Sequence, residues 1–374
     1  MTDSSSPSST ARFFFYVLAF LGVALIFSAF SDWKSPVIKD LFSDSKPGIA
    51  LDPFAIDRGV PSGSSFAFSR NNALWVSGAS GSDATGTGAE SNPFRTIQKG
   101  LNAMVDGQAL AIRPGTYREA LDMPTVGTPG KGLLVTGMGS GKTIVDITGT
   151  GTEHAVEFAN GASHITLQNL SIRGGADSGR WSHGVYISKE GKNEHIILKN
   201  LDIDWNGQKD RGSGIFVFEQ AAANLEVQNV KATGASDGIY LKGSNAIKVQ
   251  NCTFFNNIED GIDLNGGTEI FLLDNECYGN GDRGIAVHGN ELPQSGGVLR
   301  GNNLHGNKDG IAFYLAAGTR VIDNRIEGNA AYGLRIAGQN LTIEKNYFSG
   351  NTEGHINENP NSVNITYSDN VLED

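Results

Sequence analysis

Four acidic residues form the part of this sequence that is best suited to chemistry. Glu259 and Asp260 are adjacent, Asp263 follows shortly after them, and Asp237 lies one sequence repeat earlier. Carboxylates held close together repel one another, and a cluster of oxygen ligands suits Ca²⁺, which takes about six to eight of them. We therefore predict a calcium site formed by Asp237, Glu259, Asp260 and Asp263.

A repeat places these acids in register. Its marker is a Gly followed by an aliphatic residue, and the spacing of about 23 residues is in the range of a solenoid. The repeat runs through Gly184-Val185, Gly214-Ile215, Gly238-Ile239, Gly261-Ile262, Gly284-Ile285, Gly310-Ile311 and Gly333-Leu334. Two columns of Asn run in step with it, Asn251, Asn275, Asn302, Asn324 and Asn346, and Asn256, Asn280, Asn307, Asn329 and Asn351.

Short apolar alternations between the columns, such as Ile247-Lys248-Val249, predict strands with one buried face. Short strands at a fixed period, with no helix between them, favour an all-β fold. We predict a single-stranded right-handed parallel β-helix over residues 71–374, in which equivalent side chains stack from coil to coil. A β-propeller would repeat nearer 40 residues, and the Leu pattern of a leucine-rich repeat is absent from the sequence.

Strand alternation assigns side chains to faces of this β-helix. The residue after each Gly should point inward, and the second and fourth residues after it outward. Asp237 and Asp260, which precede Gly in consecutive coils, should then stack within about 5 Å on the same outward face as Asp263. Hydrogen-bonded turn chemistry is the alternative role for such acids, and it is the role we expect for Asp309.

The first part of the chain differs in composition. Residues 1–31 are expected to be a signal peptide or membrane anchor, because the apolar run Phe13–Phe30 lies at the boundary between a secretory segment and a spanning helix. Residues 32–70 mix Pro, Ser, Gly and charge and are expected to be a linker. The protein should be secreted, periplasmic or anchored facing outside the cytoplasm, with residues 13–30 its only membrane contact if uncleaved.

A helix is predicted to cover the open end of the solenoid. Ser91 or Asn92 can cap it, and Pro93 suits its first turn. Its apolar face consists of Phe94, Ile97, Leu101 and Met104.

Two further features are given structural rather than functional interpretations. The Gly-rich run 139–143 lacks a Gly at Thr136, and residues 144–147 predict a strand where a phosphate-binding loop needs a helix. Cys252 and Cys277 are expected to be buried free thiols, with a disulfide as the alternative. The seven His show no metal-ligand spacing.

The start of the repeat region carries a specific set of motifs. They are Val76-Ser77, Gly81-Ser82-Asp83, Asn92-Pro93-Phe94-Arg95-Thr96-Ile97-Gln98 and Arg113-Pro114-Gly115-Thr116-Tyr117. This opening resembles that of pectate-lyase-like right-handed β-helix proteins, a superfamily that includes polysaccharide lyases, mannuronan epimerases and some glycosidases. With the repeats, the resemblance covers about residues 73–372 and implies the fold more than the reaction.

The acidic cluster has a local resemblance of its own. The run 259–263 together with Asp237 is similar to the calcium site of family-nine pectate lyases, except that Glu259 stands where the family has Asp. The resemblance implies that Ca²⁺ neutralises a uronate carboxylate and acidifies the C5 proton, which a Lys removes. No motif places that Lys. The candidates for the base are, in order, Arg283, Lys308 and Lys242.

Four other residues are predicted to bind the sugar chain. They are Trp181, Trp205, Tyr240 and His288. Loop packing is the alternative for the two Trp. Arg283 can instead form a salt bridge with Asp260 or Asp282.

These observations predict an exported, calcium-dependent polysaccharide lyase that cleaves a uronate polymer by β-elimination. A C5 epimerase begins with the same proton abstraction, although the Asp-Pro-His-Asp run of mannuronan epimerases is absent. A non-catalytic carbohydrate-binding or surface β-helix is the alternative from another class. The net charge of −11 repels anionic polymers unless a cation bridges them. We therefore expect an acidic polysaccharide as partner, no nucleic acid, and a monomer.

Overall fold

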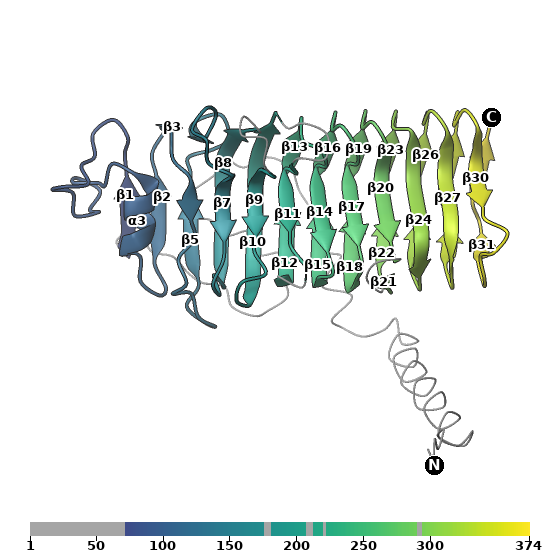
Figure 1. The fold of residues 1–374 in the computed structure, drawn as a ribbon, viewed down its shortest axis with the longest axis horizontal. Helices are drawn as coiled ribbons and strands as arrows, with labels where there is room; N and C mark the ends of the chain where they lie inside the picture. The colour runs from purple at the N-terminus through teal and green to yellow at the C-terminus, as the bar shows by residue number, and fades with distance from the viewer. Residues whose placement is uncertain (1–71, 176–180, 207–211, 220–221, 290–293) are drawn as a thin grey trace, which may run out of the picture. The chain divides into compact units, whose positions relative to one another are not determined.

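The protein winds into coils that stack along one axis (Figure 1). The computed structural model describes residues 72–175, 181–206, 212–219, 222–289 and 294–374. Neighbouring coils pair through parallel strands, and the predicted right-handed parallel β-helix is confirmed.

The predicted export segment and linker, residues 1–31 and 32–70, lie outside the described residues. Within the described part of the chain, no helix combines the length and the apolar character needed to cross a membrane.

Each coil contributes to three rows of strands, which we call rows A, B and C. Row A consists of β1 (Ala73–Val76), β2 (Ala109–Ile112), β5 (Leu133–Thr136), the first parts of β8 (Ile165–Gly174) and β10 (Asn193–Trp205), β12 (Ala222–Gln228), β15 (Asn245–Gln250), β18 (Gly267–Leu273), β22 (Val298–Arg300), β25 (Arg320–Ile322), β28 (Thr342–Glu344) and β31 (Thr366–Ser368). Row B consists of β3 (Gly115–Tyr117), β6 (Thr143–Asp146), the last parts of β8 and β10, β13 (Lys231–Thr233), β16 (Thr253–Phe255), β19 (Glu276–Tyr278), β23 (Asn303–His305), β26 (Arg325–Glu327), β29 (Tyr347–Ser349) and β32 (Val371–Glu373).

Row C is the row that carries the acidic cluster. It consists of β4 (Leu121–Asp122), β7 (His154–Phe158), β9 (His183–Ile187), β11 (Ile215–Val217), β14 (Ile239–Lys242), β17 (Ile262–Asn265), β20 (Arg283–His288), β24 (Asp309–Ala317), β27 (Tyr332–Gln339) and β30 (Gly354–Glu358). A short strand, β21 (Gln294–Ser295), pairs with β18 and β24.

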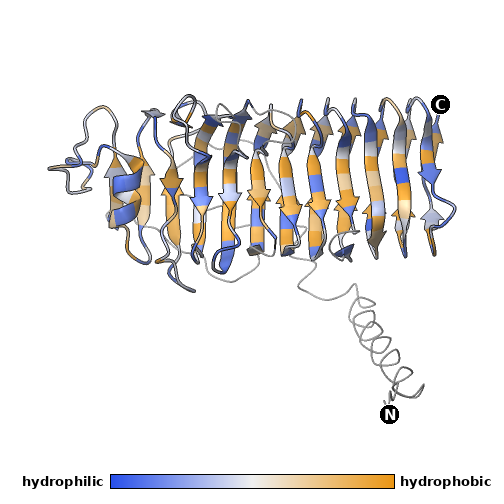
Figure 2. Cartoon of the chain, viewed as in Figure 1, coloured by the Kyte–Doolittle hydropathy of each residue, from blue (hydrophilic) through white to orange (hydrophobic). Residues whose placement is uncertain are grey.

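Apolar side chains from all three rows fill the interior along the axis. In row C the residues after the repeated Gly stack in register with no exposed surface: Val185, Ile215, Ile239, Ile262 and Ile285. Apolar and polar residues alternate along the strands (Figure 2). The prediction that the residue after Gly points inward is therefore confirmed.

The repeated Gly is required by the close approach of one coil to the next. A Cβ added to Gly238 would lie 2.6 Å from the carbonyl oxygen of Gly261, and one added to Gly261 would lie 2.7 Å from that of Gly284. Real Cβ atoms do not come this close to backbone atoms, so any side chain at these positions would push the coils apart.

Two ladders of Asn, buried except for the half-buried Asn370, connect the coils. One consists of Asn275, Asn302, Asn324, Asn346 and Asn370, and the other of Asn257, Asn280, Asn307, Asn329 and Asn351. At Asn324 the Oδ1 atom accepts from the backbone N and the Nδ2 of Asn302, both at 2.9 Å. Its Nδ2 donates to the oxygen of Leu299 and to Oδ1 of Asn346. The ladders thus satisfy backbone groups at the turns that the strands leave unpaired.

The predicted Asn columns are off by one residue at their first positions. Asn251 and Asn256 have positive φ angles of 54° and 52° and lie outside the ladders. Asn257 is the ladder residue, and the backbone N of Cys252 occupies the corresponding donor position opposite Asn275.

Helix α3 (Ile97–Ala103) lies against β1 and β2 at one end of the stack (Figure 1). The predicted apolar face is confirmed, because Phe94, Ile97, Leu101 and Met104 are all buried. The predicted start is wrong: the N-cap is Thr96, whose side chain accepts from the backbone N of Lys99. Residues 91–93 lie in the loop before the helix, where Asn92 forms an isolated β-bridge with Ala89.

Two acids that are distant in sequence fix where this helix begins. Asp83 accepts from the backbone N of Arg95 and of Thr96, and Glu119 accepts from the backbone N of Ile97 and of Gln98. These carboxylates satisfy N–H groups that the first turn leaves without partners, and they complement the helix dipole.

The structural interpretations of the Gly-rich run and of the two Cys are confirmed. The run 139–143 leads directly into strand β6, so no helix presents N–H groups to a phosphate. Cys252 and Cys277 are free and buried.

We expect the substitution Asn324→Ala to lower the free energy of unfolding by about 3 kcal/mol, because it removes partners from buried N–H and C=O groups on both neighbouring coils. Urea unfolding followed by circular dichroism would measure this. The matched control is Asn361→Ala, whose side chain is exposed. Equal loss of stability in both variants would contradict a structural role for the ladder.

Candidate functional site

The structure brings three of the four predicted metal ligands together on row C. One carboxylate oxygen from each of Asp237, Asp260 and Asp263 lies within 4.8 Å of the others. Asp263 projects from β17 and is the register neighbour of Tyr240 on β14. The fourth predicted ligand, Glu259, accepts a hydrogen bond from Oγ of Ser236 at 3.1 Å.

Two of these acids are buried rather than outward-facing as predicted. Asp237 is 7% exposed and Asp260 is 2% exposed. The cause is a hydrogen bond to the next coil: Oδ1 of Asp237 accepts from the backbone N of Asp260, and Oδ1 of Asp260 accepts from that of Arg283. In the same way, Oδ1 of Asp309 accepts from the backbone N of Tyr332 at 3.0 Å. The predicted turn chemistry is therefore present, both at Asp309 and within the cluster.

The clustering makes the charged form of these carboxylates unfavourable. Burial raises the pKa of Asp237 well above its ordinary value, and the nearby charges of Asp263, Asp260 and Glu259 raise it further. Burial also raises the pKa of Asp260 to about 6, although the adjacent Arg283 acts in the opposite direction. A cation placed among these oxygens would relieve both effects.

Arg283 forms the salt bridge that was the alternative to its role as a base. Its Nη1 lies 3.1 Å from Oδ2 of Asp260 and 3.8 Å from Oδ2 of Asp282, and its guanidinium carbon lies 5.3 Å from the centre of the Tyr314 ring. Burial alone would lower the pKa of Arg283, but Asp260, Tyr314 and Asp282 raise it above its ordinary value. A guanidinium held in this way is a fixed cation and is poorly suited to accept a proton.

The other two candidate bases lie in different surroundings. Lys308 is exposed, and its Nζ lies 3.2 Å from Oδ1 of Asp282. Lys242 is the last residue of β14 and lines the same hollow as Asp237 and Asp263. Of the three candidates, Lys242 is the one that lines this hollow.

The acidic cluster lies at the edge of a surface hollow of about 500 Å³, which we call the aromatic hollow. Its lining residues are Glu153, His154, Trp181, His183, Tyr186, Ser213, Phe216, Phe218, Ser236, Asp237, Tyr240, Lys242, Glu259 and Asp263. Phe216 and Tyr240 stack face to face, with ring centres 5.0 Å apart and planes 4° apart. Because these faces cover each other, the rings present mainly their edges to the hollow.

Three of the four predicted sugar-binding residues lie at this site. Trp181 is 59% exposed and lines the aromatic hollow, as does Tyr240. Nε2 of His288 lies 3.6 Å from Oδ1 of Asp263, and its ring stacks on Tyr314. Trp205 is the exception: it has no exposed surface and donates from Nε1 to the backbone oxygen of Ser182. Its predicted sugar-binding role is wrong because the ring belongs to the core.

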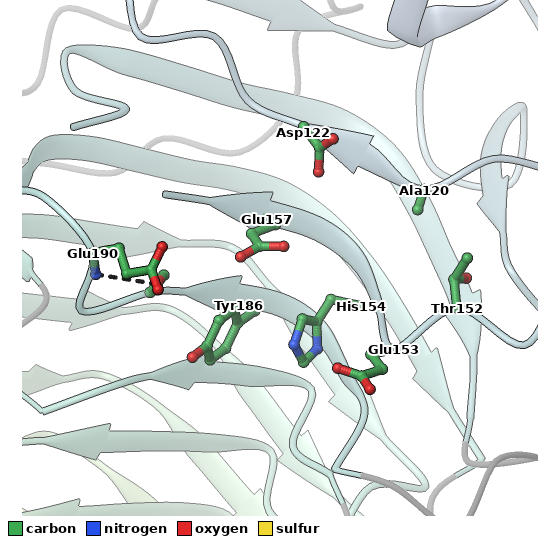
Figure 3. Close-up of a pocket in the computed structure, with 9 residues that line it drawn as sticks. Ala120, Asp122, Thr152, Glu153, His154, Glu157, Tyr186 and Glu190 are labelled. Atoms are coloured by element: carbon green, nitrogen blue, oxygen red, sulfur yellow. Dashed lines mark hydrogen bonds between the residues drawn. The ribbon is translucent and has the colours of Figure 1, made fainter. Parts of the chain in front are cut away.

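A second hollow, which was not predicted from the sequence, adjoins the first along row C. It has a volume of about 460 Å³, and we call it the acidic hollow (Figure 3). It is lined by Ala120, Asp122, Thr152, Glu153, His154, Glu157, Tyr186, Ser188 and Glu190. A signal was available, since the run from His154 to Glu157 has the pattern of the run from His183 to Tyr186, but Ala155 replaces the Gly that marks the later coils.

Two His that line the aromatic hollow are held as neutral rings. Nδ1 of His154 accepts from the backbone N of His183, and Nδ1 of His183 accepts from that of Ser213. Burial lowers the pKa of His154 to about 4 and that of His183 well below its ordinary value. With Nδ1 accepting, the proton of each neutral ring is on Nε2.

Two family models match parts of the chain. The model described as "Right handed beta helix region" matches residues 237–374, and the model described as "Periplasmic copper-binding protein (NosD)" matches residues 123–287. The uncharacterized protein YwoF of Bacillus subtilis (strain 168) is 28% identical over 215 residues, which are 52% of this chain and 43% of that protein. The chain thus spans less than half the length of this relative.

Several solved structures share the fold. A protein named XylC, solved with xylose, has 10% identity and a TM-score of 0.57, with 77% of this chain and 70% of that one covered. A rhamnogalacturonan lyase has 14% identity and a TM-score of 0.55, with coverage of 79% and 87%. Pectate lyase Pel9A has 16% identity and a TM-score of 0.50, with coverage of 81% and 78%. These likenesses confirm the predicted fold, a right-handed β-helix similar to that of pectate lyases.

The buried carboxylates predict a pH dependence of stability. Asp237 and Asp260 bind protons more tightly in the folded chain than in the unfolded chain, where the ordinary pKa is 3.8. Their contribution to the free energy of unfolding therefore falls as the pH rises above about 4, and for Asp260 this fall ends above about pH 6. We expect Asp237→Asn to lose less stability than the parent between acidic and neutral pH.

Urea unfolding in the presence of a chelator, repeated across this pH range, would measure the difference. The matched control is Asp202→Asn, which removes an exposed carboxylate on β10. A pH profile of Asp237→Asn that parallels the parent would contradict the assigned electrostatics.

Proposed function

We propose that this right-handed β-helix is an exported, calcium-dependent polysaccharide lyase that cleaves a uronate-containing polymer by β-elimination. The observation that carries the proposal is the convergence of Asp237, Asp260 and Asp263 at the edge of a hollow that Lys242 also lines. The sugar-acting proteins among the solved structures of this fold are consistent with a carbohydrate ligand. The apolar run 13–30 supports export.

The donor chemistry of the cluster fits a hard cation. Its three converging groups are all carboxylates, which suit Ca²⁺, whereas copper is usually bound by imidazole, thiolate or thioether groups. His154 and His183 commit Nδ1 to backbone N–H groups, and both Cys are buried. His288, with Nε2 3.6 Å from Oδ1 of Asp263, adds a single imidazole beside three carboxylates. The copper named in one matching family description is therefore a poor fit to these residues.

The residues around the cluster have distinct proposed roles. Asp237, Asp260 and Asp263 would hold the cation, with Glu259 beside them, and Arg283 would keep Asp260 oriented through its salt bridge. When bound, Ca²⁺ would neutralise the uronate carboxylate and so make the adjacent C5 proton more acidic. Lys242 would remove that proton as the general base.

The aromatic hollow would position the sugar chain beside these groups. Trp181 offers an exposed ring face, and the edges of Phe216 and Tyr240 form an apolar wall. Rings of this kind pack against the apolar faces of sugars.

The lyase proposal predicts a specific pattern of activities. We expect the parent to produce ultraviolet-absorbing unsaturated uronate from an acidic polysaccharide with calcium, and none with a chelator. Lys242→Ala should reduce the rate by about 10²- to 10⁴-fold, the usual contribution of a general base, while retaining calcium binding. Asp263→Asn should weaken calcium binding, measured by titration calorimetry.

Lys308→Ala is the matched control, since it removes a Lys that pairs with Asp282 away from the hollow. Its rate should match that of the parent. Loss of activity in Lys308→Ala with normal activity in Lys242→Ala would assign the base differently. Uronate that exchanges its C5 proton without forming the unsaturated product would indicate the epimerase instead.

A further inference from the structure

The acidic hollow and the aromatic hollow adjoin each other along row C, and we call the two together the groove. They share Glu153, His154 and Tyr186 as lining residues. The rings of His154 and Tyr186 stack with their centres 4.2 Å apart at this junction. A polymer bound beside the acidic cluster can therefore continue over β9 and β7 into the acidic hollow.

The groove is long enough for several sugar units. Glu157, Tyr186, Phe216, Tyr240 and Asp263 are successive register neighbours on row C. At the spacing of adjacent strands, the four steps from Glu157 to Asp263 correspond to about 19 Å. The acidic hollow thus receives a sugar some units away from the one at the cluster.

The two hollows differ in charge. The aromatic hollow also has four acids in its lining, Glu153, Asp237, Glu259 and Asp263, but the last three belong to the predicted calcium site, where a bound cation would offset their charge. Its lining also includes the cation of Lys242, and Nζ of Lys189 lies 5.0 Å from the centre of the Phe218 ring in its wall. Among the described residues that line the acidic hollow there is no Lys or Arg, while four are acidic: Asp122, Glu153, Glu157 and Glu190. The carboxylates of Asp122, Glu153 and Glu157 lie around one space in Figure 3.

This charge pattern excludes a uronate from the acidic hollow and suits an uncharged sugar. Burial raises the pKa of Glu157, and the charges of Asp122, Glu190 and Glu153 raise it further, so an added anion would meet strong repulsion. The hydroxyl groups of an uncharged sugar can instead donate to these carboxylates, and such charge-assisted hydrogen bonds are strong. Tyr186, Thr152 and His154 add a phenol, a hydroxyl and an imidazole to the same surface.

We propose that the acidic hollow binds an uncharged sugar of the same chain whose uronate lies at the acidic cluster, so that the substrate is a heteropolymer rather than a homopolymer of uronate. This inference rests on the proposed function, under which the uronate binds at the acidic cluster. Glu157 and Glu190 act as specificity determinants that reject a second uronate at this distance along the chain.

Binding of two defined polymers tests the inference. The full chain in mild detergent with calcium would be titrated with polygalacturonate, in which every unit is a uronate, and with a rhamnogalacturonan backbone, in which uronate and uncharged sugar alternate. We expect the alternating polymer to bind at least about tenfold more tightly than polygalacturonate at low salt. The difference in affinity should decrease at higher salt, because salt screens the repulsion between carboxylates. The double variant Glu157→Gln/Glu190→Gln should gain affinity for polygalacturonate.

The matched control is Asp202→Asn/Asp204→Asn, which removes two exposed charges from the row B part of β10. It should leave the preference unchanged. Tyr186→Ala should weaken binding of the alternating polymer.

Equal or tighter binding of polygalacturonate by the parent, an equal gain in the control, or no binding of either polymer would overturn the inference. If the protein eliminates polygalacturonate and shows no preference for the alternating polymer, the lyase proposal stands and the heteropolymer proposal is wrong. If the protein prefers the alternating polymer but shows no calcium-dependent elimination, the proposed specificity of the groove stands and the lyase proposal is wrong.

Discussion

The register between successive coils is the constraint on which the rest of this structure depends. Each coil places its backbone against the next so closely that Gly238 and Gly261 tolerate no side chain. The Asn ladders satisfy the polar groups at the turns between strands and hold the same register. Because every coil repeats the same positions, a residue type chosen once per coil becomes a line of side chains along the surface, and row C is such a line.

In the acidic cluster, the register between coils brings carboxylates together into a candidate metal site, and their mutual repulsion lowers the stability of the fold. Asp237 and Asp260 perform an ordinary structural task, since each accepts a backbone N–H from the next coil, as Asp309 does. The addition of Asp263 on β17, three residues after Asp260, converts that turn motif into a group of mutually repelling carboxylates. Asp309 pairs with Arg335 at 3.1 Å much as Asp260 pairs with Arg283, but Ala312 stands in its coil at the position of Asp263. The same turn can therefore be structural in one coil and a candidate metal site in another.

Much of this arrangement could be predicted from the sequence because the repeat carries its own register. The Gly-aliphatic steps identified the inward residues, and from them the convergence of Asp237, Asp260 and Asp263. The predictions failed where tertiary contacts decide the outcome. The start of α3 is set by Asp83 and Glu119 from elsewhere in the chain. Trp205 is buried because it is the last residue of β10 and points into the core, which its polar neighbours in the sequence concealed.

The position of Cys277 links the core to the candidate site. A Cβ on Gly261 would lie 2.9 Å from Cβ of Cys277, so this thiol packs directly beneath the backbone between Asp260 and Asp263. It has no exposed surface, and burial raises its pKa well above the ordinary value. A thiol-specific reagent can therefore reach it only when the coil that carries the carboxylates separates from its neighbours. With Cys252 replaced by Ser, Cys277 is the only thiol of the chain, and its labelling rate measures how often this coil opens.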